Sequence, residues 1–303
     1  MHIYTHPEFL NHEVAEGHAE RPERLSHLLA HLQREGILSD SPLRQPNDVS
    51  DAQILAAHSL EHLQFLRSSA PSEGVVPLDP DTWMSKASMN AARLAAGAVC
   101  NAVDDVLTTT ENRVFCAVRP PGHHAETGSA MGFCLLNSIA IGALHALQQP
   151  GIERVAIVDF DVHHGNGSVD ICQHHPEIMV CSSFQHPYYP NRLDDLDQPN
   201  IVNTPLQAGS NGDVFRRAIS SSWLPALQRH QPDLVLVSAG FDAHQADPLA
   251  ALNLTEADFT WITQQLVDVA NLHSQGRMVS TLEGGYDLNA LAKSASAHLQ
   301  ALM

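Results

Sequence analysis

An aspartate and a histidine lie two residues apart just after an apolar run, and of all residues in the chain they are best suited to bind a metal ion. Residues 155–158 are apolar and predict a buried strand that ends in a glycine-containing turn. Because side chains alternate along an extended chain, Asp161 and His163 project from the same face. Nitrogen and oxygen ligands together suit a divalent cation such as zinc. Asp242 ends a second apolar run and can supply the third ligand that a catalytic zinc needs.

Two further groups of residues suited to catalysis follow other apolar runs. His123 and His124 lie in a loop rich in proline and glycine, which is rigid enough for both neighbours to reach one cleft. Imidazole titrates near neutral pH, so a histidine there can move a proton. Tyr286 follows two glycines, whose backbone freedom permits an unusual loop. Its phenol could donate a hydrogen bond to the oxyanion of a tetrahedral intermediate.

These residues belong to five motifs that occur in a fixed order. They are RPPGHHA at 119–125, GFCLLN at 132–137, DFDVHHGNG at 159–167, SAGFDAH at 238–244 and LEGGY at 282–286. Together they closely resemble the zinc-dependent histone deacetylase superfamily, which also contains acetylpolyamine amidohydrolases and acetoin-utilisation proteins. The resemblance extends from GHAERPERL at 17–25 to the end of the chain. The motifs are specific for the superfamily and much less specific for the substrate.

The resemblance implies a role for each residue of the catalytic centre. Asp161, His163 and Asp242 would bind Zn²⁺, and His124 would be the general base. His124, or His123 as its electrostatic partner, would also assist departure of the amine. Tyr286 would stabilise the oxyanion. Two partners would orient the histidines, namely Asp159 for His123 and Asn166 for His124; class I relatives have Asp at the latter position and class II relatives have Asn, so the chain is similar to class II.

The resemblance also indicates where the substrate would bind. Phe133 and Tyr189 are candidates for the walls of an acyl-lysine channel, and Gly132 could offer its carbonyl to the substrate amide. Family members usually have Phe where Tyr189 stands, so the rim departs from the family pattern. A structural K⁺ could be held by the residues that match the potassium site of relatives, which are Asp159, Asp161, His163, Ser182 and Ser183.

The implied reaction is removal of acetyl or other short acyl groups from lysine side chains of proteins or peptides. The alternative is an acetylpolyamine or other small amine as substrate. Polyamine-specific relatives carry an acidic gatekeeper or an insertion, whereas this chain has Leu249 at the corresponding position. Two remoter alternatives are less favoured. An arginase-like dinuclear hydrolase needs a carboxylate where this chain has Gly165, and an inactive acyl-lysine-binding module would lack the base or the tyrosine.

The elements that must position these residues alternate between strand and helix. Apolar runs predict strands at 2–5, 113–118, 153–160, 177–183, 233–239 and 277–283. Helical patterns cover 22–35, 51–69 with a break near His58, 86–106, 137–148, 167–174, 212–229, 255–274 and 287–301, with Ser85 and the Thr255–Asp258 stretch as caps. The pattern predicts a three-layer α/β/α fold with a central, mostly parallel sheet, which the resemblance identifies as the arginase–deacetylase fold. Each chemical motif follows a strand end, where open α/β sheets bind ligands.

Composition limits the class of protein further. The chain has 303 residues without a linker-like tract, which predicts a single domain spanning 1–303. Acidic residues number 34 against 16 basic ones, a net charge of −18, which argues against nucleic-acid binding and would attract cationic substrates. The sequence shows neither a signal peptide nor a long apolar run, so we expect a cytoplasmic protein without a membrane partner. Five cysteines without a CxxC motif indicate reduced, buried thiols.

Overall fold

A parallel β-sheet forms the centre of the protein. The computed structural model describes residues 1–303. Eight strands lie side by side, and every neighbouring pair is parallel. Their order across the sheet is β2 (Leu43–Arg44), β1 (His2–Tyr4), β5 (Arg113–Cys116), β10 (Met278–Leu282), β9 (Leu234–Ala239), β6 (Val155–Asp159), β7 (Ile178–Gln185) and β8 (Ile201–Leu206). The inner strands are buried on both faces, which explains their continuous apolar runs.

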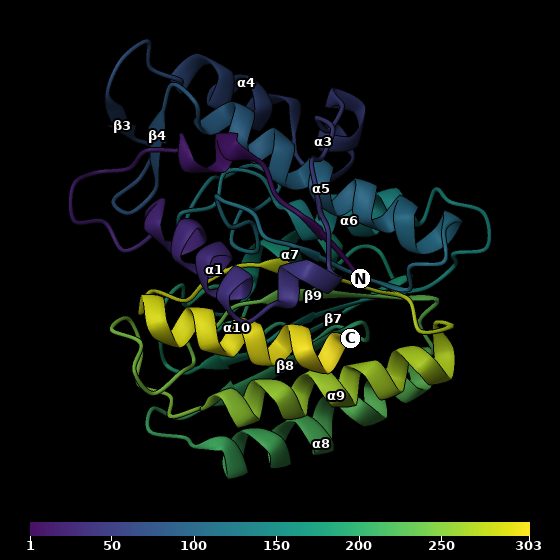
Figure 1. Ribbon diagram of the computed structural model, residues 1–303. Coiled ribbons are helices and arrows are strands. Elements are labelled where there is room, and N and C mark those ends of the chain that lie inside the picture. The colour runs from purple at the N-terminus through teal and green to yellow at the C-terminus, as the bar shows by residue number, and fades with distance from the viewer.

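Helices cover both faces of the sheet, as Figure 1 shows. One layer contains α3 (Asp51–Ala57), α4 (Leu60–Ser69), α5 (Ser88–Thr108), α6 (Ser138–Ala146) and the short α7 (Asn166–Cys172). The other contains α8 (Gly212–His230), α9 (Glu256–His273) and α10 (Leu288–Leu302), with α1 (Glu23–Arg34) packed on α10. Short elements complete the chain: the 3-10 helix η1 (Pro7–Leu10), α2 (Ile37–Asp40) and the antiparallel pair β3 (Val75–Pro77) and β4 (Trp83–Ser85). The expected three-layer α/β/α architecture is confirmed.

The strands missing from the sequence prediction lie at the margins of the fold. β8 is an edge strand that contains Pro205, and a proline within an apolar run argues against a strand unless that strand lies at an edge. β2 forms the opposite edge with only two exposed residues. β3 and β4 pair only with each other. Short or edge strands bury little apolar surface, so they leave a weak sequence pattern.

The expected helix boundaries are mostly confirmed. The break near His58 is real, because α3 ends there in extended backbone and Ser59 caps the start of α4. At α9, the Asp258 carboxylate accepts hydrogen bonds from the backbone and hydroxyl of Thr255, both at 2.9 Å. The cap expected at Ser85 was wrong. Helix α5 begins at Ser88, whose own hydroxyl accepts from the Ser85 backbone N–H at 2.7 Å.

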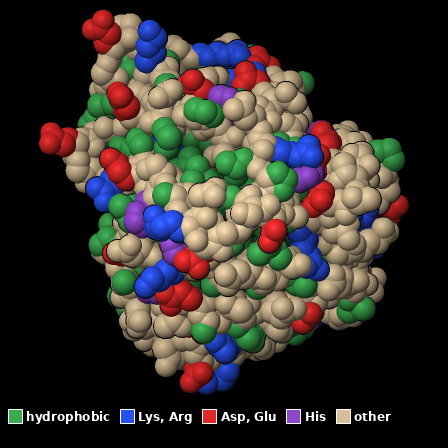
Figure 2. Space-filling model, in the orientation of Figure 1, with side chains coloured by type: hydrophobic (Ala, Val, Ile, Leu, Met, Phe, Trp, Pro, Cys, Tyr) green, Lys and Arg blue, Asp and Glu red, His purple; other side chains and the backbone are tan.

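One face of the molecule is mixed in charge despite the acidic composition. On the face in Figure 2, Asp and Glu side chains are interspersed with Lys and Arg. None of the helices combines the length and the apolar character that crossing a bilayer would require. All five cysteines are free and buried, as expected for reduced thiols.

Candidate active site

Three ligand-type side chains converge beyond the carboxyl ends of β6 and β9. The ligand atoms of Asp161, His163 and Asp242 all lie within 4.8 Å of one another, and all three residues are buried. His163 Nδ1 is 3.0 Å from Asp161 Oδ1 and 3.2 Å from Asp242 Oδ2. The two strands are direct neighbours in the sheet, so their ends deliver these residues to one point. The structure therefore brings together the predicted metal-ligand set.

The cluster has the properties of a cation site. Asp242 Oδ2 is buried without a hydrogen-bond donor, and a buried carboxylate oxygen normally requires a partner. Gly240 and Gly284 press against the carboxylates, and a Cβ at either would overlap Asp161 Oδ2 or Asp242 Oδ2. Burial alone would lower the pKa of His163, but the adjacent carboxylates of Asp161 and Asp242 raise it to about 10. The proton on His163 supplies positive charge at the point where a metal cation would bind. The donor set of two carboxylates and one imidazole fits zinc.

The histidine pair of the 119–125 loop lies beside this cluster. His123 Nδ1 is 2.9 Å from Asp159 Oδ2, which is the predicted pairing. Burial would lower the pKa of His123, but the carboxylates of Asp159 and Asp161 raise it well above its ordinary value. His124 is the opposite case, because burial and the nearby His123 and His163 lower its pKa well below the ordinary value. One ring is therefore suited to remain a cation and the other to remain neutral.

His124 has the partner predicted from the sequence. Its Nδ1 lies 2.6 Å from Asn166 Oδ1, and both residues are buried. Asn166 begins α7, directly after the turn that follows Asp161 and His163. Gly165 in that turn has no room for a side chain, because a Cβ there would overlap Asp159 Oδ2. A bridging carboxylate for a second metal therefore has no place at this position, which argues against the dinuclear alternative.

A narrow cavity of about 130 Å³ leads from the surface to the metal-ligand cluster. It is lined by Asp81, His124, Gly132, Phe133, His163, Tyr188, Tyr189, Leu249 and Tyr286. All four residues expected to contact substrate lie on it. The cavity also contains Asp81 and Tyr188, which were not predicted.

Aromatic rings form the walls of this cavity. Phe133 meets Tyr286 edge to face with ring centroids 5.7 Å apart. Tyr189 meets the His124 ring edge to face at 5.3 Å, as a wall residue would. Tyr188 stacks on His163 at 5.6 Å, and its hydroxyl donates to the Leu249 carbonyl. The second wall is thus made by two adjacent tyrosines, whereas the sequence indicated only one.

Hydrogen bonds with Arg24 and Asp247 hold the loop that carries Tyr286. Arg24 donates to the carbonyls of Glu283 and Gly285 at 2.5 and 2.6 Å, and its guanidinium lies 4.8 Å from the Tyr286 ring centre. The Tyr286 backbone N–H donates to Asp247 Oδ2 at 2.7 Å. Burial raises the pKa of the phenol well above its ordinary value, so it stays protonated and can donate a hydrogen bond.

The residues expected for potassium lie around the end of β6. Ser182 on β7 is the register partner of Asp159, and its hydroxyl accepts from the Gly165 backbone N–H at 3.2 Å. Ser183 follows it and is buried.

Gly132, expected to present its carbonyl to substrate, already accepts from the Cys134 thiol at 3.2 Å, and a carbonyl retains a second lone pair for a further donor.

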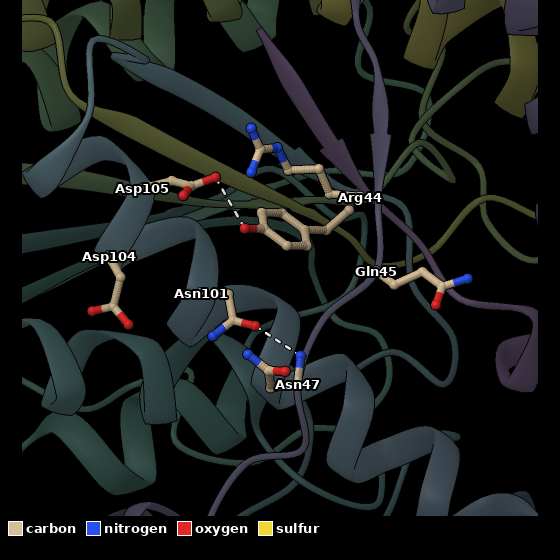
Figure 3. A pocket seen from close by; sticks show the side chains of 7 residues that line it. Arg44, Gln45, Asn47, Asn101, Asp104 and Asp105 are labelled. Atoms are coloured by element: carbon tan, nitrogen blue, oxygen red, sulfur yellow. Dashed lines mark hydrogen bonds between the residues drawn. The ribbon is translucent and has the colours of Figure 1, made fainter.

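A second hollow, of about 460 Å³, lies at the edge of the sheet near β1 and β2. Figure 3 shows its polar side chains, most of which point toward one another. The Tyr4 hydroxyl donates to Asp105 at 2.9 Å, and Asn101 accepts from the backbone of Asn47 at 2.8 Å. No residue of the five motifs lines it. The residue types suited to catalysis therefore lie on the narrow cavity and not on this hollow.

Comparison with known proteins agrees with this placement. A histone deacetylase domain model matches residues 18–302. An uncharacterized protein of Synechocystis is 43% identical, covering 99% of this chain and 98% of its own length. A histone deacetylase-like amidohydrolase of Pseudomonas aeruginosa is 35% identical over 90% of this chain and 73% of its own. The crystal structure of the HDA15 HD domain superposes with a TM-score of 0.92 at 33% identity, covering 100% of this chain and 90% of that one.

The fold and the match over nearly the whole chain define a hydrolase of the arginase–deacetylase fold. The chain belongs to the histone deacetylase family. This family depends on zinc, and the triad described above has the composition that such a metal requires. Deacetylases cleave amides, so the residues around the cavity must bind an acylated amine and handle the proton that hydrolysis moves.

Proposed function

We propose that the chain removes acetyl or other short acyl groups from lysine side chains, using Zn²⁺ held by Asp161, His163 and Asp242. The observation that carries the proposal is a narrow, largely aromatic cavity that leads to this triad and also exposes a base and a phenol. An apolar slot of this kind suits the methylene chain of lysine, and polar groups at its inner end select the amide. Zinc in the triad would polarise the acyl carbonyl and make bound water more acidic.

The protein side chains then handle the proton and the developing charge. His124 accepts the proton of the attacking water, because its lowered pKa keeps the ring neutral. His123, held as a cation by Asp159, stabilises negative charge at the reacting centre, and the proton reaches the leaving amine from one of these histidines. Tyr286 donates a hydrogen bond to the oxyanion from the opposite wall. We assign the structural K⁺ site to Asp159, Asp161, His163, Ser182 and Ser183, supported by the register of β6 and β7.

Acylated lysine peptides are the proposed substrate because Leu249 places an apolar side chain where a polyamine enzyme needs an anion. Leu249 lines the cavity, and its carbonyl is bound by the Tyr188 hydroxyl, so this segment forms part of the wall. No acidic side chain lines the cavity near Leu249 in the gatekeeper loop. The mouth therefore favours a neutral peptide chain over a second ammonium group on this side.

Acetylpolyamines are the second candidate, favoured by Asp81. This half-buried carboxylate lines the same cavity, and burial together with Asp79 raises its pKa. Its Oδ1 accepts hydrogen bonds from Gly132 N–H at 3.2 Å and from the Thr82 hydroxyl at 3.1 Å. A distal ammonium would be attracted to this group, although its raised pKa reduces the charge that it presents.

The test compares kcat/KM for acetyl-lysine peptides, acetylspermidine and acetylputrescine with zinc-loaded protein at about 150 mM salt, where exposed charges are screened beyond ~8 Å. We expect the peptides to be preferred. Leu249→Glu should shift the preference toward polyamines, and Asp81→Asn should lower polyamine turnover more than peptide turnover. A preference of the unaltered protein for acetylpolyamines would contradict the lysine assignment and favour the Asp81 alternative. Absence of hydrolysis with every acylated amine would contradict both.

A further inference from the structure

Asn166, the partner of His124, is itself held by a buried carboxylate. Asn166 Nδ2 donates to Glu126 Oε1 at 2.7 Å, while Asn166 Oδ1 faces His124 Nδ1 at 2.6 Å. Glu126 is 5% exposed, and Asn166 is fully buried. The three side chains thus form a line from carboxylate to amide to imidazole, which ends at the cavity where His124 lies.

Hydrogen bonds hold both the side chain and the backbone of Glu126. Arg192 donates to both Glu126 oxygens, at 2.8 and 2.7 Å, from the loop that also carries the wall tyrosines. The Glu126 backbone N–H donates to the Ser129 carbonyl at 2.9 Å, and its own carbonyl lies 2.9 Å from His58 Nδ1. Burial lowers the pKa of His58 to about 3, so this ring stays neutral and donates to the carbonyl. Glu126 therefore has a fixed position from which to act on Asn166.

Asparagine at position 166 needs Glu126 to set the orientation of its amide. Aspartate at this position would not, because both of its oxygens accept hydrogen bonds. The two ends of an Asn side chain have nearly the same shape but opposite hydrogen-bonding character. A carboxylate only accepts, so Glu126 requires the NH₂ group and turns Asn166 Oδ1 toward His124. An amide oxygen in turn accepts only from a protonated Nδ1. The neutral ring then carries its proton on Nδ1 and leaves Nε2 free to accept one.

We propose that Glu126 is a positioning residue that acts through Asn166 to hold His124 in the tautomer competent to act as a base. This inference rests on the proposed role of His124 as the base. A flipped Asn166 would point its NH₂ group at Nδ1 and favour a ring protonated on Nε2, which cannot accept a proton from water. Glu126 prevents the flip, because the amide oxygen would then face its carboxylate.

The first test is Glu126→Gln. Glutamine satisfies either orientation of Asn166, since its side chain both donates and accepts, so the wrong tautomer of His124 becomes populated. We expect kcat on an acetyl-lysine peptide to fall about 10-fold or more with little change in KM, the usual range for partners that orient active-site ligands. Asp258→Asn is the matched control: Asp258 is also buried and paired with a surface arginine, Arg216, at 2.8 Å, but it caps α9. That variant should lower Tm and leave kcat unchanged.

Rescue distinguishes orientation from stability. In Glu126→Gln/Asn166→Asp, the new carboxylate can only accept from His124 Nδ1, so it selects the correct tautomer without Glu126. We expect this double variant to have at least several-fold higher kcat than Glu126→Gln. In an Asn166→Ala background, Glu126→Gln should have no further effect, because the residue through which Glu126 acts is gone. Equal losses in the presence and absence of Asn166, or no rescue when Asn166→Asp is added to Glu126→Gln, would overturn the proposal.

His124→Ala separates failure of this inference from failure of the proposed function. If His124→Ala retains turnover on an acetyl-lysine peptide, the deacylase function stands, but His124 is not the base and this inference falls. Absence of turnover in the unaltered zinc-loaded protein would contradict the proposed function itself. If His124→Ala is inactive while Glu126→Gln has normal kcat, the base assignment stands and only the role of Glu126 is wrong. Thermal melts of every variant show which losses of activity come from unfolding.

Discussion

Asp161 and His163 share one buried point with Asp242, which lies far along the chain, and the two carboxylates carry more negative charge than the one imidazole can offset. Asp161 and Asp242 would repel each other, and burial together with Asp161 raises the pKa of Asp242. A proton on His163 offsets this repulsion. A divalent metal does so more fully, because it contacts all three ligands and satisfies the orphaned Asp242 Oδ2. At the scale of single residues, the site is therefore incomplete without a cation.

Asp161→Ala should lose the metal and the activity together, since it removes one of the three ligands. Metal content per chain, measured by atomic emission on purified protein, should fall from about one to near zero. Asp105→Asn, in the hollow of Figure 3, is the control and should keep a full complement of metal. Retention of stoichiometric metal by Asp161→Ala would exclude the proposed ligand set.

Tyr286→Phe should lower kcat by roughly 10²–10³, the usual effect of losing one oxyanion donor, while fold and metal content are retained. Tyr4→Phe is a matched control, because it also removes a hydroxyl from a buried tyrosine, one whose partner is Asp105. That control should affect stability alone. Near-normal turnover by Tyr286→Phe on an acetyl-lysine peptide would show that this phenol has only a structural role.

At the scale of elements, the site is built by loops that follow parallel strand ends and are held together by hydrogen bonds to carboxylates. Asp247 is the clearest example, because it links the loop after β9 to the loop after β10. Its Oδ2 accepts from the backbone of Tyr286 at 2.7 Å and of Asp287 at 3.3 Å, and its Oδ1 accepts from Leu249 N–H at 3.0 Å. One side chain thus positions both the oxyanion tyrosine and a cavity wall.

Asp247→Asn should lower kcat by about 10-fold, because the amide replaces one acceptor oxygen with a donor, and a buried hydrogen-bonding group left without its partner costs ~1–3 kcal/mol. The reason is misplacement of Tyr286, so the same substitution should have little effect in a Tyr286→Phe background. Steady-state kinetics on the four proteins of this cycle measure the coupling. Equal losses in both backgrounds would show that Asp247 acts independently of Tyr286.

At the scale of the whole molecule, several histidines are buried and neutral, which makes the fold sensitive to acid. Burial lowers the pKa of His58 to about 3, of His164 to about 4 and of His298 to about 3. Their unfolded value is about 6.5. Below that pH the unfolded chain binds protons that the folded chain excludes, so this contribution to stability is complete above pH ~6.5 and is lost as pH falls toward ~3.

His298→Gln tests this dependence in the core. His298 lies between Thr263 Oγ1 at 2.6 Å and Ser280 Oγ at 2.8 Å. Each neutral buried histidine contributes a slope of up to about 1.4 kcal/mol per pH unit, so the variant should lose less stability between pH 6 and pH 4.5 than the unaltered protein. Urea denaturation at both pH values measures the slope. His174→Gln, at an exposed position, should leave it unchanged, and an unchanged slope in His298→Gln would contradict the prediction.

Local periodicity along the chain was enough to predict the inner strands and the direction of the side chains that follow them. The inner strands were predictable because both of their faces are buried, and the shared direction of Asp161 and His163 follows from alternation along an extended chain. The motif order then identified the family and the partners of the two histidines. The edge strand β8 was missed because Pro205 is tolerated only where no neighbour needs its N–H.

Which distant side chains meet depends on how the folded loops pack, and no local pattern predicts it. Asp81 reaches the cavity from a turn 51 residues before Gly132, its backbone partner, and an aspartate in a turn carries no signal of such a role. Glu126 contacts Asn166 across 40 residues, because the loops after β5 and β6 pack together although β10 and β9 lie between these strands in the sheet. Periodicity describes how a segment faces its neighbours but not which neighbour it meets. The orientation of His124 is therefore decided by packing between loops rather than by any pattern along the chain.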